Sequence, residues 1–203
     1  MARPAARAEG RDGPPEIRYL SAADGAAIAA HLMRLSPEDR RFRFFCAVGD
    51  AGIRMHCGAL RAPRLALIGA FRAGRLIGFG ELALPRLFGP GGAEFALSID
   101  EGERRRGTGA LLLATALAIA RNRIARRVAL RCLGDNHAML GLARRSGARL
   151  RCAQGEVEAA LRAPGPNLRS LLAEARLTFG ALTGAFRRLS GRPGLTRPGM
   201  PAT

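Results

Sequence analysis

Residues 93–123 constrain the fold most, because a strand pattern, a loop rich in arginine and glycine and a long apolar helix pattern follow one another there. AEFALSID (93–100) is typical of a strand with one buried face. GALLLATALAIA (109–120) is typical of a buried helix and is too short to cross a bilayer. A helix that starts directly after a glycine-rich turn presents several free backbone N–H groups to an anion. We therefore expect a mixed α and β fold with an anion site at this turn.

The remaining chain alternates strand and helix patterns in the order β-α-α-β-β-β-α-β-α-β-β. Strand patterns cover 16–20, 65–71, 75–84, 93–100 and 127–133 and a final hairpin covers 148–162, while helix patterns cover 22–35, 36–45, 109–123 and 136–147. Ser21 with Asp24, and Ser36 before Pro37, mark two helix starts. The pattern predicts an α+β fold, a central sheet with helices on both faces.

Three segments follow from composition. Residues 1–15 are rich in Pro, Ala, Arg and Gly and are expected to form a disordered tail. Residues 16–163 are expected to form one domain, and residues 164–203 a basic amphipathic helical tail.

The tail carries an apolar heptad seam. Its members are Leu168, Leu172, Ala175, Phe179, Leu182, Phe186 and Leu189. We expect this seam to cover apolar surface on the chain's own domain or on a second copy in a homodimer. A membrane interface is the less favoured alternative.

Charge limits the partners. The chain has 33 basic residues, all Arg, against 16 acidic ones, and its net charge is +17, which favours anionic ligands. The sequence argues against nucleic acid as a partner, because only ten residues are aromatic and no DNA-reading motif is present.

The four cysteines indicate the compartment. Cys46, Cys57, Cys132 and Cys152 show neither a CxxC pair nor zinc-type spacing to a histidine. We expect reduced, mostly buried thiols and no metal site. The N-terminal residues lack the apolar core of a secretory signal, so we expect a cytoplasmic protein.

The loop at 104–110, RRRGTGA, matches the pattern Q/R-x-x-G-x-G-A/G. It is no Walker loop, because the chain contains no Lys. It is no dinucleotide fingerprint either, because that motif needs a third glycine where Leu112 stands. A merely solvated turn stays an alternative.

With the strand before it and NHAMLGLARRSGA after it, this loop resembles the acetyl-CoA-binding core of the GNAT N-acetyltransferase superfamily. The resemblance spans about residues 16–162 and is most specific over 93–149. LSPEDRRFRFF (35–45) is also similar to the second helix of the acetyltransferase domain of bacterial protein-lysine acetyltransferases. The resemblance implies a mixed, mostly antiparallel sheet and acetyl-CoA as co-substrate.

The resemblance also implies the coenzyme-binding residues. In this family, loop amides grip the pyrophosphate and an Asn that opens the next helix bonds the pantetheine arm, while strand amides can donate to the thioester carbonyl. The matching positions are Leu97, Ser98, Ile99, Arg104, Arg105, Arg106, Gly107, Thr108, Gly109, Ala110, Asn136 and Met139. Helix capping alone is an alternative explanation of Asn136.

Glu81 and Glu94 are the candidate catalytic residues, because both lie inside otherwise apolar strands. Acetyl transfer to an amine needs a base that takes the amine proton. If the two strands pair antiparallel, the carboxylates lie opposite or diagonal, and burial and like charge would raise a carboxyl pKa. By position, Glu94 matches the family's base. Solvent-facing carboxylates are the alternative.

Two departures from the family stand out. Many members carry a Tyr that protonates the departing thiolate, and Ala143 occupies that slot here, while the chain's one Tyr is Tyr19. Ala148 replaces a usual aromatic residue. The general acid is therefore unassigned.

We expect acetyl transfer from acetyl-CoA to a primary amine, a protein lysine or a small molecule, in a direct ternary complex. A non-catalytic acyl-CoA-binding or regulatory domain is the alternative.

Overall fold

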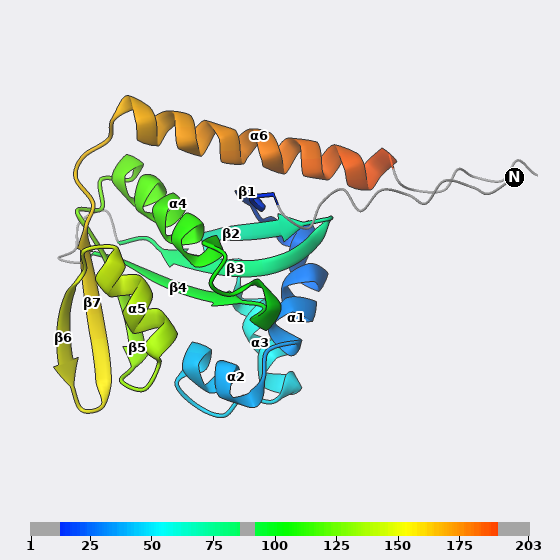
Figure 1. Ribbon diagram of the computed structural model, residues 1–203. Helices are drawn as coiled ribbons and strands as arrows, with labels where there is room; N and C mark the ends of the chain where they lie inside the picture. Colours follow the sequence, from blue (N-terminus) through cyan, green and yellow to red (C-terminus); the bar gives the residue numbers. More distant parts are fainter. Residues whose placement is uncertain (1–12, 86–91, 191–203) are drawn as a thin grey trace, which may run out of the picture.

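The computed structural model describes residues 13–85 and 92–190, and of residues 184–190 only the backbone. Its described strands form one sheet in the order β1-β2-β3-β4-β5-β7-β6, in which β4 and β5 are the parallel pair (Figure 1). The strands are β1 (Glu16–Tyr19), β2 (Leu65–Arg72), β3 (Arg75–Ala83), β4 (Ala93–Ile99), β5 (Arg127–Leu133), β6 (Arg149–Ala153) and β7 (Glu156–Arg162). The expected mixed, mostly antiparallel sheet is confirmed.

Helices cover both faces of the sheet, as expected. They are α1 (Gly25–Met33), α2 (Pro37–Phe44), α3 (Asp50–Ala59), α4 (Thr108–Asn122), α5 (His137–Arg145) and α6 (Leu168–Ser190), with short 3-10 turns at Ala22–Asp24 and Glu101–Glu103. One apolar core joins the sheet to α4, α5 and α6, and a second joins the opposite face to α1 and α3. The sheet is thus the middle layer of three.

Both predicted hairpins are present, and their turns explain the tight connection. Ala73 and Gly74 link β2 to β3 with φ of 48° and 76°, and Gln154 and Gly155 link β6 to β7 with φ of 50° and 81°. Two consecutive left-handed residues give the turn whose twist matches that of paired strands.

The helix α3 was not predicted. Its sequence, DAGIRMHCGA, contains two glycines and buries only Ile53 fully, so its helical period is weak. The neighbouring start of α2 was predicted correctly, because the Ser36 hydroxyl accepts a hydrogen bond from the Asp39 N–H at 3.1 Å.

The helix α6 lies across β1 and α4, but not through the predicted seam (Figure 1). Ser170 and Leu177 on its inner side are buried. The described large apolar members of the seam point outward, with exposed fractions of 73% for Leu168, 53% for Leu172, 69% for Phe179 and 65% for Leu182. The expectation that the seam covers the core is therefore wrong, and a homodimer through this helix stays an unsupported prediction.

Some expectations concern residues outside the description. These are most of the N-terminal tail (1–12), the turn at 86–91, the side chains of Phe186 and Leu189, and residues 191–203.

The thiols differ from expectation. Cys132 is buried, but Cys46 and Cys152 are exposed, so the expectation of mostly buried thiols is wrong.

Among the described helices, none has the length and hydropathy of a membrane span.

Candidate active site

The central strands β4 and β5 separate after a short contact, and a cavity opens between them. Their parallel pairing is confined to Ala93 with Val128 and Glu94 with Ala129. Past that point the cavity has a volume of about 1230 Å³. The Asp100 N–H bonds to the Ile77 carbonyl of β3 at 2.9 Å. Because backbone groups alternate along a strand, the N–H and C=O groups of the odd-numbered positions 97 and 99 face the open side.

The loop before α4 forms one end of the cavity. Arg105 and Gly107 have left-handed backbones, with φ of 58° and 82°. Gly107 is also the N-cap residue of α4, so the first N–H groups of that helix, which have no acceptor within the helix, lie at this loop; we call residues 104–110 with these groups the nest. Arg105 holds its left-handed conformation without the freedom of glycine, a strain that is common at ligand sites.

Most of the predicted coenzyme residues line this cavity. They are Leu97, Ser98, Ile99, Arg104, Arg105, Gly107, Gly109, Ala110, Asn136 and Met139. Arg106 and Thr108 do not line it: Arg106 is exposed, and Thr108 is buried with a hydroxyl that has no hydrogen-bond partner among the described residues.

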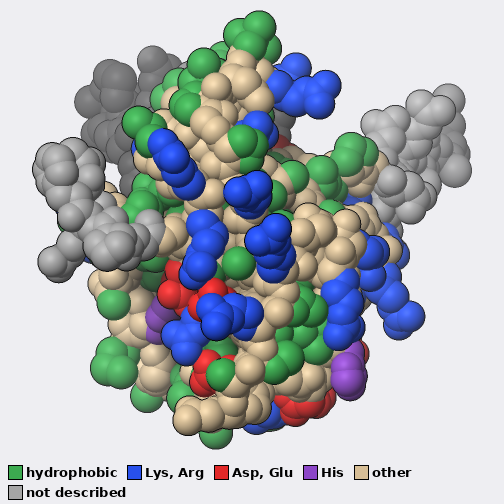
Figure 2. Space-filling model, turned by 90° about the vertical axis from the view of Figure 1, so that its left-hand side faces the viewer, with side chains coloured by type: hydrophobic (Ala, Val, Ile, Leu, Met, Phe, Trp, Pro, Cys, Tyr) green, Lys and Arg blue, Asp and Glu red, His purple; other side chains and the backbone are tan. Residues whose placement is uncertain are grey.

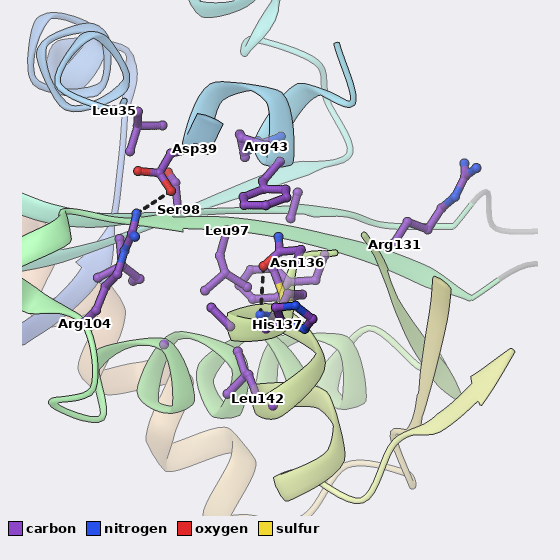
Figure 3. A pocket seen from close by; sticks show the side chains of 18 of the residues that line it. Leu35, Asp39, Arg43, Leu97, Ser98, Arg104, Arg131, Asn136, His137 and Leu142 are labelled. Atoms are coloured by element: carbon purple, nitrogen blue, oxygen red, sulfur yellow. Dashed lines mark hydrogen bonds and ion pairs between the residues drawn. The ribbon is translucent and has the colours of Figure 1, made fainter. Parts of the chain in front are cut away.

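The helix α2 roofs the cavity and is tied to both of its ends. Asp39 pairs with Arg104 of the loop at 2.5 Å, as the dashed line in Figure 3 marks. Arg41 pairs with Asp135, which precedes α5, also at 2.5 Å. This contact holds the pKa of Asp135 below its ordinary value, through the hydrogen bond from Arg41. The roof is thus fixed by charge pairs rather than by a buried apolar face, because α2 has no fully buried residue.

A basic surface adjoins the cavity. Arg131 lines it, and Figure 2 shows further arginine side chains gathered on this side of the molecule. Arg127, Arg149 and Arg151 of the strands β5 and β6 are exposed. Arg131 and Arg127 pair with Glu156 and Glu158, at 2.8 and 2.9 Å, so their charges are partly compensated.

Glu94 faces the cavity and Glu81 does not. The register pairs Ala83 with Glu94 and Glu81 with Ala96, so the two acids are diagonal neighbours on one face, as one of the two expected arrangements requires. Glu94 is exposed and forms no hydrogen bond or ion pair with any described residue. It therefore has its carboxylate free at the cavity wall.

Glu81 is instead the centre of a buried cluster. It accepts hydrogen bonds from the Arg43 guanidinium of α2 and contacts His56 Nε2 of α3 at 2.8 Å. Burial acts to raise the pKa of Glu81, but the hydrogen bond from His56 and the charge of Arg43 outweigh it and hold the pKa below its ordinary value. The expected rise in pKa is wrong for this residue.

Comparison with known proteins identifies the family. The model of the acetyltransferase (GNAT) family matches residues 28–148, more than half of the chain. This chain belongs to the GNAT acetyltransferase family. Membership implies acyl transfer from acetyl-CoA, and it leaves the acceptor open. No curated protein matches this GNAT chain in sequence.

Solved structures share the fold of this GNAT chain. The GNAT domain of S. lividans PAT has a TM-score of 0.66 at 22% identity, over 79% of this chain and 99% of that one. YncA of Salmonella typhimurium, solved with acetyl-CoA, has a TM-score of 0.57 at 15% identity, over 77% and 99%. The ribosomal-protein-alanine N-acetyltransferase of Brucella melitensis has 0.54 at 17% identity, over 72% and 98%. These likenesses concern the fold alone.

Asn136 caps α5 and also lines the cavity. Its Oδ1 accepts the Met139 N–H at 3.0 Å, which is the capping interaction expected from sequence. Figure 3 shows its side-chain nitrogen turned away from the helix, toward the side of α2. The capping oxygen and the free amide are separate atoms, so one role does not exclude the other.

The usual proton donor of the family has no counterpart at its expected place. Ala143 is fully buried in the core. Tyr19 lies on β1, three strands away from β4, and donates to Glu174 at 2.7 Å. Burial and this hydrogen bond to a carboxylate raise the pKa of Tyr19. The phenol is thus committed to α6 and cannot serve the cavity.

One polar cluster beside the cavity was missed from the sequence. His31 of α1 is fully buried, with Nε2 at 2.9 Å from Ser98 Oγ and Nδ1 at 2.8 Å from Asp100 Oδ1. The ring N–H does not point squarely at that oxygen, so the second contact is an ion-pair distance rather than an aligned hydrogen bond. The available signal was a titratable side chain on the apolar face of a helix, three residues after Ile28.

Proposed function

We propose that this chain moves an acetyl group from acetyl-CoA to a primary amine, of a protein lysine or of a small molecule, by direct attack in a ternary complex. The observation that carries the proposal is the free edge of β4, which begins after the last pair with β5, at Glu94, and runs to the nest at 104–110. Acetyl-CoA is an elongated donor molecule with an anionic diphosphate at one end and a thioester at the other, and it fits such a cleft.

The nest is the proposed pyrophosphate site. Its backbone N–H groups and Arg104 and Arg105 offer the donors that a diphosphate rewards. Arg104 now pairs with Asp39, so the coenzyme phosphates would compete with that carboxylate. Arg106 and Thr108 contribute through the backbone of the loop in this proposal.

The pantetheine arm is proposed to lie along β4 as an added strand. The backbone groups of Leu97 and Ile99 face the open side, and Asn136 and Met139 form the facing wall. A backbone N–H on this edge also suits the oxyanion that develops on the thioester carbonyl.

Glu94 is the proposed base. Its free carboxylate is at the cavity wall, whereas Glu81 is held by Arg43 and His56 and is a weaker proton acceptor. In this proposal Glu81 positions the roof helix α2. Glu38 also lines the cavity, and its carboxylate, like that of Glu94, has no ion-pair partner among the described residues. These two carboxylates suit a cationic amine as the acceptor.

Binding is tested with a matched pair of variants at Gly109. A Cβ there would meet Leu142 and Leu97 at 3.6 Å, an ordinary contact, so Gly109→Ala should fold normally and serve as the control. Gly109→Val adds two methyl groups in the cleft and should weaken acetyl-CoA binding at least about tenfold, or about 1.4 kcal/mol. Calorimetry showing equal affinities in two folded variants would contradict the proposed site.

Turnover is tested by coenzyme release with protein, peptide, polyamine and aminoglycoside acceptors. Ala143 stands where many family members carry the proton-donating Tyr. The absence of that donor favours a second candidate function, a non-catalytic acyl-CoA-binding domain. Tight acetyl-CoA binding without transfer to any amine would establish this second candidate.

A further inference from the structure

The buried cluster of Ser98, His31 and Asp100 connects the cavity to the protein interior. Ser98 lines the cavity from β4 and is labelled there in Figure 3. Its hydroxyl contacts His31 Nε2 at 2.9 Å, and His31 Nδ1 contacts Asp100 at 2.8 Å. A hydroxyl, an imidazole and a carboxylate in sequence are the parts with which proteins move a proton to and from a reacting group.

Asp100 forms the inner end of this cluster. It faces two guanidinium groups, Arg34 at 2.9 Å and Arg75 at 3.0 Å. The contacts with His31 and Arg34 hold the pKa of Asp100 below its ordinary value against the effect of burial. With a proton on Nδ1, which faces Asp100, the fully buried ring of His31 offers Nε2 as the acceptor for the Ser98 hydroxyl.

Proton counting shows what such an acceptor could do. An ammonium acceptor has three N–H protons, and the amide product has one, so two protons must leave the nitrogen. The first leaves before attack, since only the neutral amine is nucleophilic. The second leaves as the C–N bond forms and the C–S bond breaks, when the departing thiolate needs a proton.

We propose that Ser98 and His31 are the shuttle for the second proton. The amine nitrogen attacks the thioester carbonyl carbon, and its proton passes to Ser98 Oγ while the Ser98 proton passes to His31 Nε2. The C–S bond then breaks, and the same path returns the proton from His31 through Ser98 to the sulfur, giving free CoA thiol. Asp100 stabilises the transient imidazolium.

This inference rests on the proposed acetyl transfer and assigns a role beyond it. Glu94 passes the first amine proton to solvent, and the Ser98–His31 shuttle keeps the second amine proton within the site. The shuttle takes over the proton-donating role of the tyrosine that this chain lacks near the cavity. It leaves His31 with the same number of protons at the end of the reaction as at the start.

The test compares Ser98→Ala with Ser98→Thr, which keeps the hydroxyl. Ser98→Ala should lower kcat about 10²-fold, with acetyl-CoA affinity unchanged within about twofold. Ser98→Thr should recover most of that loss. Higher pH should partly restore Glu94→Gln, because more amine arrives deprotonated, but it should not restore Ser98→Ala, whose missing step follows attack.

The outcomes separate the alternatives. If Ser98→Ala keeps more than about a third of wild-type kcat, or recovers with pH as Glu94→Gln does, the shuttle is refuted. Acetyl-Ser98 in peptide maps after incubation with acetyl-CoA alone would make Ser98 a nucleophile and also refute it. A wild type that binds acetyl-CoA and acetylates no amine refutes the proposed function itself, and the shuttle with it.

A second measurement needs no variant. The chain has three histidines, so nitrogen-15 NMR of histidine-labelled protein can separate them. We expect Nδ1 of His31 to carry a proton and Nε2 to accept a hydrogen bond. A proton on Nε2 in the free protein would overturn the shuttle.

Discussion

The ion pair between Glu81 and Arg43 offers the sharpest stability test. Their side chains are 11% and 8% exposed, so neither charge is well solvated. Breaking a buried pair by removing one charge costs about 3–5 kcal/mol. Glu81→Gln keeps an oxygen that can accept from Arg43, so we expect the lower end, about 3 kcal/mol.

This loss converts into a measurable melting shift. For a chain of this length, 1 kcal/mol corresponds to about 2–4 °C, so Glu81→Gln should melt about 6–12 °C lower. Thermal unfolding followed by circular dichroism measures this shift. Arg43→Met should cost a similar amount, because it leaves Glu81 buried with only His56 as a partner.

The double variant decides between a true pair and two independent losses. Removing both charges leaves no uncompensated ion, so its cost should fall below the sum of the single costs by about 1–3 kcal/mol. Additivity within about 0.5 kcal/mol would refute the reasoning.

The same carboxylate predicts a pH dependence. The pKa of Glu81 is lowered from 4.5, so its contribution is complete above about pH 4.5 and is lost as pH falls through the folded-state pKa. Glu81→Gln should therefore lose less stability than wild type on acidification below pH 4.5. Equal acid sensitivity of the two proteins would show that Glu81 is not responsible.

Three further perturbations have defined outcomes. Glu94→Gln should lower kcat about 10²–10⁴-fold in steady-state assays at neutral pH, and a change of only a few-fold would remove Glu94 as the base. In calorimetry, Arg104→Ala should weaken acetyl-CoA binding about tenfold, while Asp39→Asn should strengthen it by freeing Arg104; a weaker Asp39→Asn complex would refute that competition. Deleting residues 165–203 should lower the melting temperature, because it uncovers apolar surface of β1 and α4, and an unchanged melting temperature would make α6 dispensable.

Local signals predicted much of the fold. The Ser36 cap, the Ala73-Gly74 turn and the loop at 104–110 each depend on a few adjacent residues. Such features are fixed by short-range backbone chemistry, so the sequence alone carries them. The same holds for most of the predicted positions that line the cavity, because they follow one another along β4 and its loop.

The parts that were missed depend on distant residues. Glu81 meets Arg43 and His56 from 38 and 25 positions away, and these contacts reverse the expected direction of its pKa. Ser98 meets His31 across 67 positions. No local pattern encodes which helix face lies over which strand, so charge clusters of this kind appear only in the folded chain.

The heptad seam of α6 illustrates the same limit. Periodicity indicates that a helix has an apolar face, but not which face docks. Here Glu174 bonds to Tyr19, Asn122 and Arg123, and Ser170 bonds to Asn122. These polar contacts orient the opposite face inward and leave the seam outside.

The packing of α6 on β1 also affects how the chain can fold during synthesis. The Tyr19 hydroxyl bonds to Glu174 across 155 positions, so the ribosome delivers the strand long before the helix that covers it. At about 5–20 residues per second, the delay is about 8–30 s. Throughout that interval the sheet lacks part of its cover, and the nascent chain exposes a surface that chaperones can bind. Completion of the native fold thus waits for the last helix to emerge, however early the sheet itself assembles.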